Sequence, residues 1–287
     1  MSGKRSVRAT NIFLICLLFA VPNFAGARQN SDTQSTSQSG SGQSVLLQDA
    51  RDFVNAGVGL VKAPLQFQGE EWVRFNYIVG TTALLFLLDG VIKDFARDNQ
   101  NDLNDHIFGI DKYYGNKYGL GISAGLYGFG YAFKNEKIRH MGLYSIEAFL
   151  YSGAFTNILK FAIGRRRPYG GDDNLFFKPF RFSNMYKSLP SGHATVAFAV
   201  STVMAKSLDN ILWKAAWYGA AGLTGCARIY HNAHWTSDVF LGAAIGYGMA
   251  SLIVKIHKNE KSKKATFFSA QIRPYLGFNQ IGVQLIL

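Results

Sequence analysis

The sequence predicts an all-α fold, a bundle of six helices followed by a short β-hairpin at the C-terminal end. Apolar segments of helical length recur along the 287 residues, and polar segments separate them. Hydrophobic residues make up 48% of the chain, which is enough to build a sizeable core. Only the segment after residue 264 alternates with the period of a strand.

The N-terminal segment, residues 1–27, has the layout of a secretory signal peptide. Three basic residues open it, the apolar run 12–21 follows, and Ala25-Gly26-Ala27 offers a cleavage site between small residues. The apolar run is too short to cross a bilayer, which takes about 20 residues. An uncleaved anchor is the alternative.

The folded domain is expected over residues 45–264. A linker, 28–44, precedes it and is expected to be disordered, because it is rich in Ser, Gln, Gly and Thr. The domain opens on an amphipathic helix, 45–62. Apolar patterning then predicts the six bundle helices at 73–92, 118–132, 141–163, 192–207, 211–227 and 238–256.

Two long connections interrupt the helices, 93–117 and 164–190. The first is rich in Asn and Asp but lacks the residue order of a calcium loop, so we expect a solvated loop. Its acidic residues are then surface charges: Asp94, Asp98, Asp102, Asp105 and Asp111. The second connection is rich in Gly, Pro and Arg, which is typical of a loop.

The C-terminal tail, residues 265–287, is expected to be β-like. Apolar and other residues alternate over 281–287, and Gly277 with Asn279 would form the turn of a hairpin. A lone hairpin is marginal in water, so it would pack on the bundle, a membrane or a partner. A frayed tail is the alternative.

The first segment whose residues could take part in binding or catalysis is KFAIGRRRP, residues 160–168. Lys160 and Arg167 are two helical turns apart and share a face if the helix continues that far. A Lys and an Arg that converge make an anion site. A solvated basic helix end is the alternative, and Arg165 and Arg166 are expected to be solvated or to lie at the edge of such a site.

The second segment is Pro190-Ser191-Gly192-His193, at the start of the helix 192–207. Ser191 is expected to be the N-cap, and the backbone N–H groups that follow it favour an anion. Gly192 permits close approach of the backbone to a ligand. His193 falls in the first turn, beside that position. An ordinary cap with a surface histidine is the alternative.

The third segment contains Arg228, His234 and Asp238. His234 and Asp238 are four residues apart, so the carboxylate can reach one imidazole nitrogen and leave the other as a nucleophile. Arg228 adds a third cation. A structural His–Asp cap at the start of the last helix is the alternative.

Together the three segments resemble the signature of the type 2 phosphatidic acid phosphatase (PAP2) superfamily, which also includes the vanadium haloperoxidases. That signature is Lys-x6-Arg-Pro, then Pro-Ser-Gly-His, then Ser-Arg-x5-His-x3-Asp. Every element matches except the serine of the third motif, which is Ala227 here. The motifs cover residues 160–238, and the helices extend the resemblance to about 70–256. The resemblance implies a six-helix PAP2-type bundle.

The resemblance also implies a role for each matching residue. His234 would attack phosphorus and become a phosphohistidine, and Asp238 would orient it. His193 would protonate the leaving oxygen and then activate water. No metal or cofactor is implied, because three fixed cations neutralise the phosphate. The implied phosphate-binding residues are Lys160, Arg167, Ser191, Gly192 and Arg228.

Charge and helix parity bear on the location of the domain. In an up-down bundle the four helix ends that carry the motifs share one face. The net charge is +12, and basic residues gather toward the opposite face and in the run 255–264, which favours an active site that faces outward. If instead all six helices cross a membrane and the N-terminus lies outside, counting the helices places the active site inside. We expect export to the cell envelope, as a periplasmic membrane-associated domain or as an integral membrane protein with an outward-facing site.

The predicted function is a metal-independent phosphatase that hydrolyses a phosphate monoester or diphosphate, with a lipid as the expected carrier of that phosphate. A vanadate-dependent haloperoxidase and a non-enzymatic envelope scaffold are the alternatives. The expected partners are a phosphorylated lipid or small phosphate ester and a membrane surface. Nucleic acid is not expected, because the basic residues form no recognised module. The oligomeric state stays open, and so does the substrate: phosphatidate, phosphatidylglycerol phosphate, polyprenyl diphosphate, lipid A phosphate or a small soluble ester.

Overall fold

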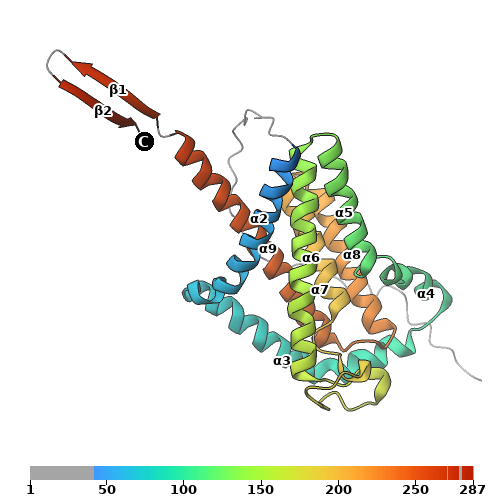
Figure 1. Ribbon diagram of the computed structural model, residues 1–287. Helices are drawn as coiled ribbons and strands as arrows, with labels where there is room; N and C mark the ends of the chain where they lie inside the picture. Colours follow the sequence, from blue (N-terminus) through green and yellow to red (C-terminus); the bar gives the residue numbers. More distant parts are fainter. Residues whose placement is uncertain (1–41, 270, 278–279, 287) are drawn as a thin grey trace, which may run out of the picture.

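The computed structural model describes residues 42–269, 271–277 and 280–286, with side chains over 45–260. The predicted signal peptide and nearly all of the predicted linker lie outside the described residues. Eight α-helices occupy the described part, with four short 3-10 helices between them (Figure 1). The α-helices are α2 Gly42–Lys62, α3 Gly69–Asp98, α4 Asp102–Phe108, α5 Lys117–Ala132, α6 Glu136–Ile163, α7 Gly192–Ser207, α8 Ile211–Tyr230 and α9 Thr236–Ser269. The 3-10 helices are η1 Ala63–Gln66, η2 Gly109–Lys112, η3 Pro168–Gly170 and η4 Asn184–Tyr186.

The six predicted bundle helices are all present, as α3 and α5 to α9, which confirms the all-α bundle. Asparagines cap the N-terminal ends of three of them, α5, α6 and α8. The Asn135 side chain accepts a hydrogen bond from the Ile138 backbone at the start of α6, and Asn210 does the same for Leu212 in α8. α6 ends at Ile163 and is capped by Gly164, whose φ of +66° is left-handed, so this position favours glycine.

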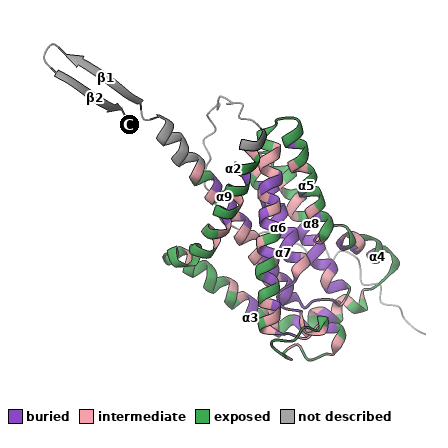
Figure 2. Cartoon of the chain, viewed as in Figure 1, coloured by how far each residue is buried: buried purple, intermediate pink, exposed green. Residues whose placement is uncertain are grey.

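α7 is the centre of the bundle. All residues from 194 to 205 are buried, and the helix packs against α6, α8 and α9 (Figure 2). α9 approaches α7 so closely at Gly242 that a Cβ there would collide with the Ser191 carbonyl. One turn earlier on α9, the Asp238 carbonyl accepts a hydrogen bond from the Ser191 backbone N–H at 2.8 Å. Tight packing of two helices therefore joins two of the sequence motifs.

The acidic stretch 93–117 is not the long solvated loop that the sequence predicts. α3 continues through its first residues, and α4 and η2 follow. Asn101 caps α4 through its side-chain oxygen. Asp111 is buried, and its Oδ2 lies 2.5 Å from Nη1 of Arg228. The prediction was wrong because Asn and Asp, which are polar in isolation, serve here as helix caps and as an ion-pair partner.

Within the described part of the chain, two helical segments are long and apolar enough to cross a membrane, α3 and residues 236–260 of α9. Only 11% of the apolar stretch of α3 is buried in the protein (Figure 2). α3 exposes many large apolar or aromatic side chains, which include Val73, Phe75, Tyr77, Leu84, Leu87 and Val91. An uncovered apolar face of this length is typical of a membrane protein.

The C-terminal tail forms the predicted hairpin, with β1 Gln271–Gly277 antiparallel to β2 Gln280–Ile286. The pairing begins with Gln271 opposite Ile286. α9 extends to Ser269, so residues 265–269 are helical rather than part of the β-like tail. In Figure 1 the hairpin lies beyond the end of α9, clear of the bundle.

Candidate active site

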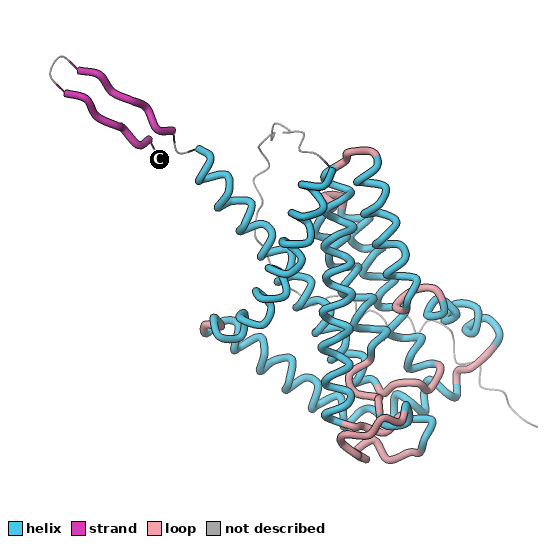
Figure 3. Tube along the Cα trace, in the orientation of Figure 1, coloured by secondary structure: helices cyan, strands magenta, loops and turns pink. Residues whose placement is uncertain are grey.

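The helix ends that carry the three motifs meet at one end of the bundle, as expected for helices that alternate in direction. They are the C-terminal ends of α6 and α8 and the N-terminal ends of α7 and α9. The loop 164–191 lies at this same end (Figure 3). The backbone N–H of His234 donates to the Arg228 carbonyl at 3.2 Å, which ties the approach to α9 to the end of α8.

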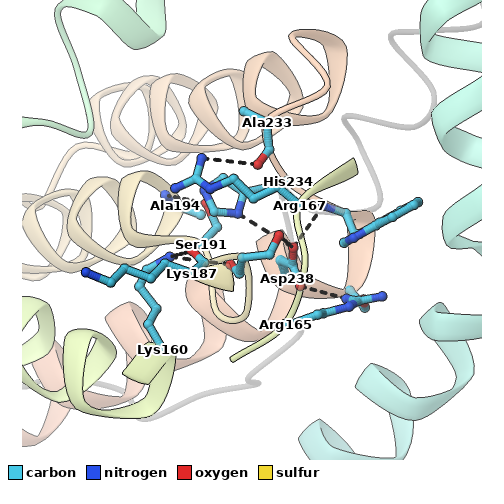
Figure 4. Close-up of polar contacts among 12 residues, drawn as sticks. Lys160, Arg165, Arg167, Lys187, Ser191, Ala194, Ala233, His234 and Asp238 are labelled. Atoms are coloured by element: carbon cyan, nitrogen blue, oxygen red, sulfur yellow. Dashed lines mark hydrogen bonds and ion pairs between the residues drawn. The ribbon is translucent and has the colours of Figure 1, made fainter. Parts of the chain in front are cut away.

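His234 lies just before α9, and its side chain is only 2% exposed. Its Nδ1 is 3.6 Å from Oδ2 of Asp238 (Figure 4). This distance allows an ion pair but is longer than a hydrogen bond, and Nδ1 has no hydrogen-bond partner among the described residues. The predicted His–Asp pair is therefore in place. Because the carboxylate faces Nδ1, Nε2 is the nitrogen left for chemistry.

The charge state of His234 follows from its surroundings. Burial lowers the pKa of His234 well below its usual value, and the charges of Lys160, Arg167 and Arg228 lower it further. The imidazole is therefore neutral near pH 7, which is the form that can act as a nucleophile.

Asp238 is fully buried and is held by hydrogen bonds to both of its oxygens (Figure 4). Oδ2 accepts from the Ser188 hydroxyl at 2.5 Å and from the Trp235 backbone N–H at 2.9 Å. Oδ1 accepts from Nη1 of Arg165 at 2.7 Å. A carboxylate with these donors has a fixed orientation, so it can in turn fix the neighbouring imidazole.

Lys160 and Arg167 lie close together, although not by the route that the sequence predicts. α6 ends at Ile163, so the two residues do not share a helix face. Instead the chain turns at Gly164 and brings Arg167 back toward Lys160. Burial, and then the charge of Arg167, lowers the pKa of Lys160 to about 7. Two cations that repel each other in this way favour an anion beside them.

Ser191 and Gly192 present the start of α7 to the same cluster. Ser191 is fully buried and is the predicted N-cap, with its hydroxyl 3.5 Å from the Ala194 backbone nitrogen. A Cβ on Gly192 would lie 3.6 Å from Cε of Lys160, so the backbone of α7 begins beside that lysine. The free N–H groups of a helix start and a lysine together suit an oxyanion.

Arg228 and His193 complete the cluster from α8 and α7. The ion pair with Asp111 orients the Arg228 side chain. Burial, and then the charge of Arg228, lowers the pKa of His193 to about 4. Ala227, which stands where the family motif has serine, is fully buried in an apolar cluster. The hydroxyl of the motif is therefore replaced by a methyl group that packs in the core.

Arg165 is the site residue that the sequence misassigned. It is fully buried rather than solvated, and its guanidinium bridges two carboxylates. Nη2 lies 2.7 Å from Oδ2 of Asp89, and Nη1 lies 2.7 Å from Oδ1 of Asp238. The ring of Phe86 covers the guanidinium at 4.0 Å. The signal available in the sequence was Asp89 itself, the only acidic residue in the apolar stretch 73–92 and therefore one that needs a partner.

Comparison with known proteins places the motif-bearing part of the chain in a family. Residues 142–262 match the family model of the PAP2 superfamily. A lipid A 1-phosphatase of Porphyromonas gingivalis is 33% identical over 124 residues, which cover 42% of this chain and 24% of that protein. A lipid A 1-phosphatase of Rhizobium etli is 36% identical over 118 residues, which cover 40% of this chain and 50% of that protein. The chain spans half or less of the length of these curated relatives.

A solved structure shares the arrangement of the helices. It is the crystal structure of a transmembrane PAP2-type phosphatidylglycerolphosphate phosphatase from Bacillus subtilis, with a TM-score of 0.50 and 21% identity. The match covers 64% of this chain and 95% of that one. At this identity the likeness shows the fold alone, a PAP2-type bundle. All three motifs lie within residues 142–262, the part of the chain that matches the PAP2 superfamily.

Proposed function

We propose that this chain is a phosphatase that removes phosphate from a lipid, with the 1-phosphate of lipid A as the leading substrate. One observation carries the proposal: three cations surround a buried, neutral histidine whose Nδ1 faces a carboxylate 3.6 Å away. The relatives at 33% and 36% identity, both named lipid A 1-phosphatases, support the substrate class. Their names support neither a haloperoxidase nor an envelope scaffold.

The proposed reaction has two steps. First, Nε2 of His234 attacks phosphorus, the bond from phosphorus to the leaving oxygen breaks, and His193 donates a proton to that oxygen. Asp238 holds the Nδ1 side of the ring and stabilises the positive charge of the phosphohistidine. Second, water attacks phosphorus while His193 takes a proton from it. The bond from phosphorus to nitrogen then breaks, and inorganic phosphate leaves.

The cations neutralise the phosphate oxygens in both steps. Lys160, Arg167 and Arg228 are assigned this role, with the Ser191 hydroxyl and the Gly192 N–H as further donors. Among the side chains described over 45–260, no three His, Cys, Asp or Glu residues converge as a metal site. We propose that the three cations supply the positive charge that the reaction needs.

We further propose that the protein acts at the cell envelope, with α3 and α9 in the membrane and the site facing outward. The signal-peptide layout of residues 1–27, the apolar face of α3 and the lipid substrate class support this location. Protease accessibility of the loop 164–190 in spheroplasts tests the orientation, and cleavage from the cytoplasmic side alone would contradict it.

A panel of substrates tests the function. The purified full-length protein is assayed with lipid A, phosphatidate, phosphatidylglycerol phosphate, a polyprenyl diphosphate and a soluble phosphate ester. We expect phosphate release from lipid substrates, with the highest kcat/KM for lipid A and loss of the phosphate at carbon 1 by mass spectrometry. A folded protein that releases phosphate from none of the lipids would contradict the proposal.

Phosphate binding is expected to take up a proton at His193. With its pKa held at about 4 by burial and Arg228, His193 is unprotonated at about pH 6, whereas Lys160, with a pKa of about 7, is already charged. A bound phosphate dianion screens the cations and raises the pKa of His193, so protons enter on binding. Calorimetry at about pH 6 in two buffers of different ionisation enthalpy measures this uptake. Equal uptake in the wild type and in His193→Gln would contradict the assignment.

A further inference from the structure

Residues 175–187, named the aromatic loop below, carry a surface that the proposed chemistry does not use. The segment contains five aromatic residues, three basic residues and no acidic residue. Two of its rings are strongly exposed, Phe180 at 66% and Phe182 at 81%. The basic residues between and beside them are Lys178, Arg181 and Lys187, of which the first two are exposed. Exposed rings interleaved with cations are typical of protein surfaces in the headgroup layer of a membrane.

Contacts with α6 hold the exposed rings of Phe180 and Phe182 in place. Phe180 has a φ of +59°, a left-handed conformation that bulky residues rarely adopt, and it is held there by contacts with α6. Its backbone N–H donates to the Phe161 carbonyl at 2.8 Å. The Phe161 ring also contacts the rings of Phe180 and Phe182, with centroids 5.5 and 4.8 Å apart. A strained, well-anchored aromatic side chain on a surface indicates a use for that surface.

The aromatic loop contacts α3 within the apolar stretch of that helix. The ring of Phe177 stacks on Phe86 of α3, with centroids 6.4 Å apart. The side-chain amide of Asn174 donates to the Phe86 carbonyl at 2.6 Å. Beyond Phe86, the exposed charges of α3 begin at Asp94, about 12 Å along the helix axis. With α3 in a membrane, this contact holds the loop against a membrane-embedded helix. The exposed aromatic and basic side chains of the loop are of the kinds that concentrate at the boundary between lipid and water.

The same loop forms part of the wall of the active site. The Arg167 backbone N–H donates to the Met185 carbonyl at 2.9 Å, and its Nε donates to the Asn184 carbonyl at 3.1 Å. Nζ of Lys160 donates to the Lys187 carbonyl at 2.7 Å. Two of the proposed phosphate-binding cations are therefore hydrogen-bonded directly to the aromatic loop. A loop seated among headgroups would hold these cations at the depth of lipid phosphates.

We propose that the aromatic loop docks into the headgroup layer of an anionic membrane, in the leaflet from which the lipid substrate is taken. Phe180 and Phe182 enter the interface, and Lys178 and Arg181 attract anionic headgroups. The three basic residues of the loop, which itself carries no acidic residue, complement the charge of such a surface. The inference rests on the proposed function, since it assigns the docking surface to the same phosphatase site.

Fluorescence quenching tests the position of the loop. The full-length Phe182→Trp variant is reconstituted into phosphatidylcholine vesicles with and without phosphatidylglycerol. Lipids brominated near the headgroup are expected to quench more fluorescence than in the wild type, whose native tryptophans give the background, and more so with phosphatidylglycerol present. Quenching of the new tryptophan by aqueous iodide but not by brominated lipid would overturn the proposal. That result would also be expected if a protein partner, rather than lipid, served as the docking partner.

Steady-state kinetics test whether the loop contributes to activity on a lipid substrate. In the phosphatidylglycerol vesicles, Phe180→Asn with Phe182→Ser is expected to lower kcat/KM for a lipid phosphate about tenfold, and Lys178→Gln with Arg181→Gln to lower it similarly. Asparagine tolerates the left-handed backbone at 180. Activity on a soluble phosphate ester is expected to change less than about twofold, because the site itself is intact.

Phe133→Ser is the matched control, because this ring is 69% exposed but lies before α6, at the opposite end of that helix from the loop. We expect it to leave both activities unchanged. Equal losses on the lipid and the soluble ester in the loop variants would overturn the docking proposal while leaving the phosphatase intact. A wild-type protein inactive on both substrates would instead refute the proposed function.

Discussion

Replacing His234 with Ala is expected to lower kcat by about 1,000-fold or more, because the variant has no nitrogen to attack phosphorus. The side chain is 2% exposed and its Nδ1 faces Asp238 at 3.6 Å, so a water molecule cannot simply take over its position and orientation. The measurement is steady-state phosphate release from a lipid phosphate. EDTA is expected to leave the wild-type rate unchanged, because Lys160, Arg167 and Arg228 supply the charge.

The matched control is His106→Ala, which removes an exposed imidazole on α4. It is expected to keep wild-type activity, since its ring is exposed and contacts the Asp102 carbonyl of its own helix. Circular dichroism verifies that both variants keep their helices. Strong turnover in a folded His234→Ala variant would refute the assignment of the nucleophile.

Replacing Arg165 with Ala is expected to lower the free energy of unfolding by about 3–5 kcal/mol, the scale found when one member of a buried charge cluster is removed. Asp89 and Asp238 would each lose a buried ion-pair partner at 2.7 Å. Denaturant unfolding in detergent, followed by circular dichroism, measures the change. Arg74→Ala is the control. Its ion pair with Glu70 is exposed, with side chains 54% and 84% accessible, so we expect a loss below about 1 kcal/mol.

Arg165→Lys separates a positioning role from a purely structural one. Lysine keeps the charge, but its single ammonium cannot reproduce the fork that joins Asp89 to Asp238. If Arg165 positions Asp238, and through it His234, kcat is expected to fall while KM for the lipid phosphate stays near the wild-type value. A change in KM alone, or equal stability losses in Arg165→Ala and Arg74→Ala, would contradict this role.

The sequence predicts the centre of the site well because its members lie close together in the chain. The spacing of four residues from His234 to Asp238, and the cap at Ser191, are local features that local geometry determines. Arg165 and Asp111 were misread for the opposite reason. Arg165 pairs with Asp89, 76 residues earlier, and Asp111 pairs with Arg228, 117 residues later. No local pattern carries such a pairing.

The apolar periodicity of the sequence predicts where the helices form, but it does not predict where they end. α3 continues past the predicted end of its apolar pattern to Asp98, in a charged turn where Arg97 pairs with Asp94 at 3.3 Å. Conversely, α6 ends at Ile163, and Gly164 redirects the chain before Arg167. Side-chain pairing lengthens one helix and backbone geometry ends the other, and neither effect appears in the hydrophobic pattern.

The central claim is a covalent phosphohistidine at His234, and trapping it is the most direct measurement. The full-length His193→Gln variant is mixed with radiolabelled 4-nitrophenyl phosphate, whose leaving group departs without a general acid, so the second step alone is stalled. We predict close to one labelled phosphoryl group per protein, stable to alkali and labile to acid, on the peptide that contains His234. Release of 4-nitrophenol with no label on the protein, or label on a residue other than His234, would contradict the account.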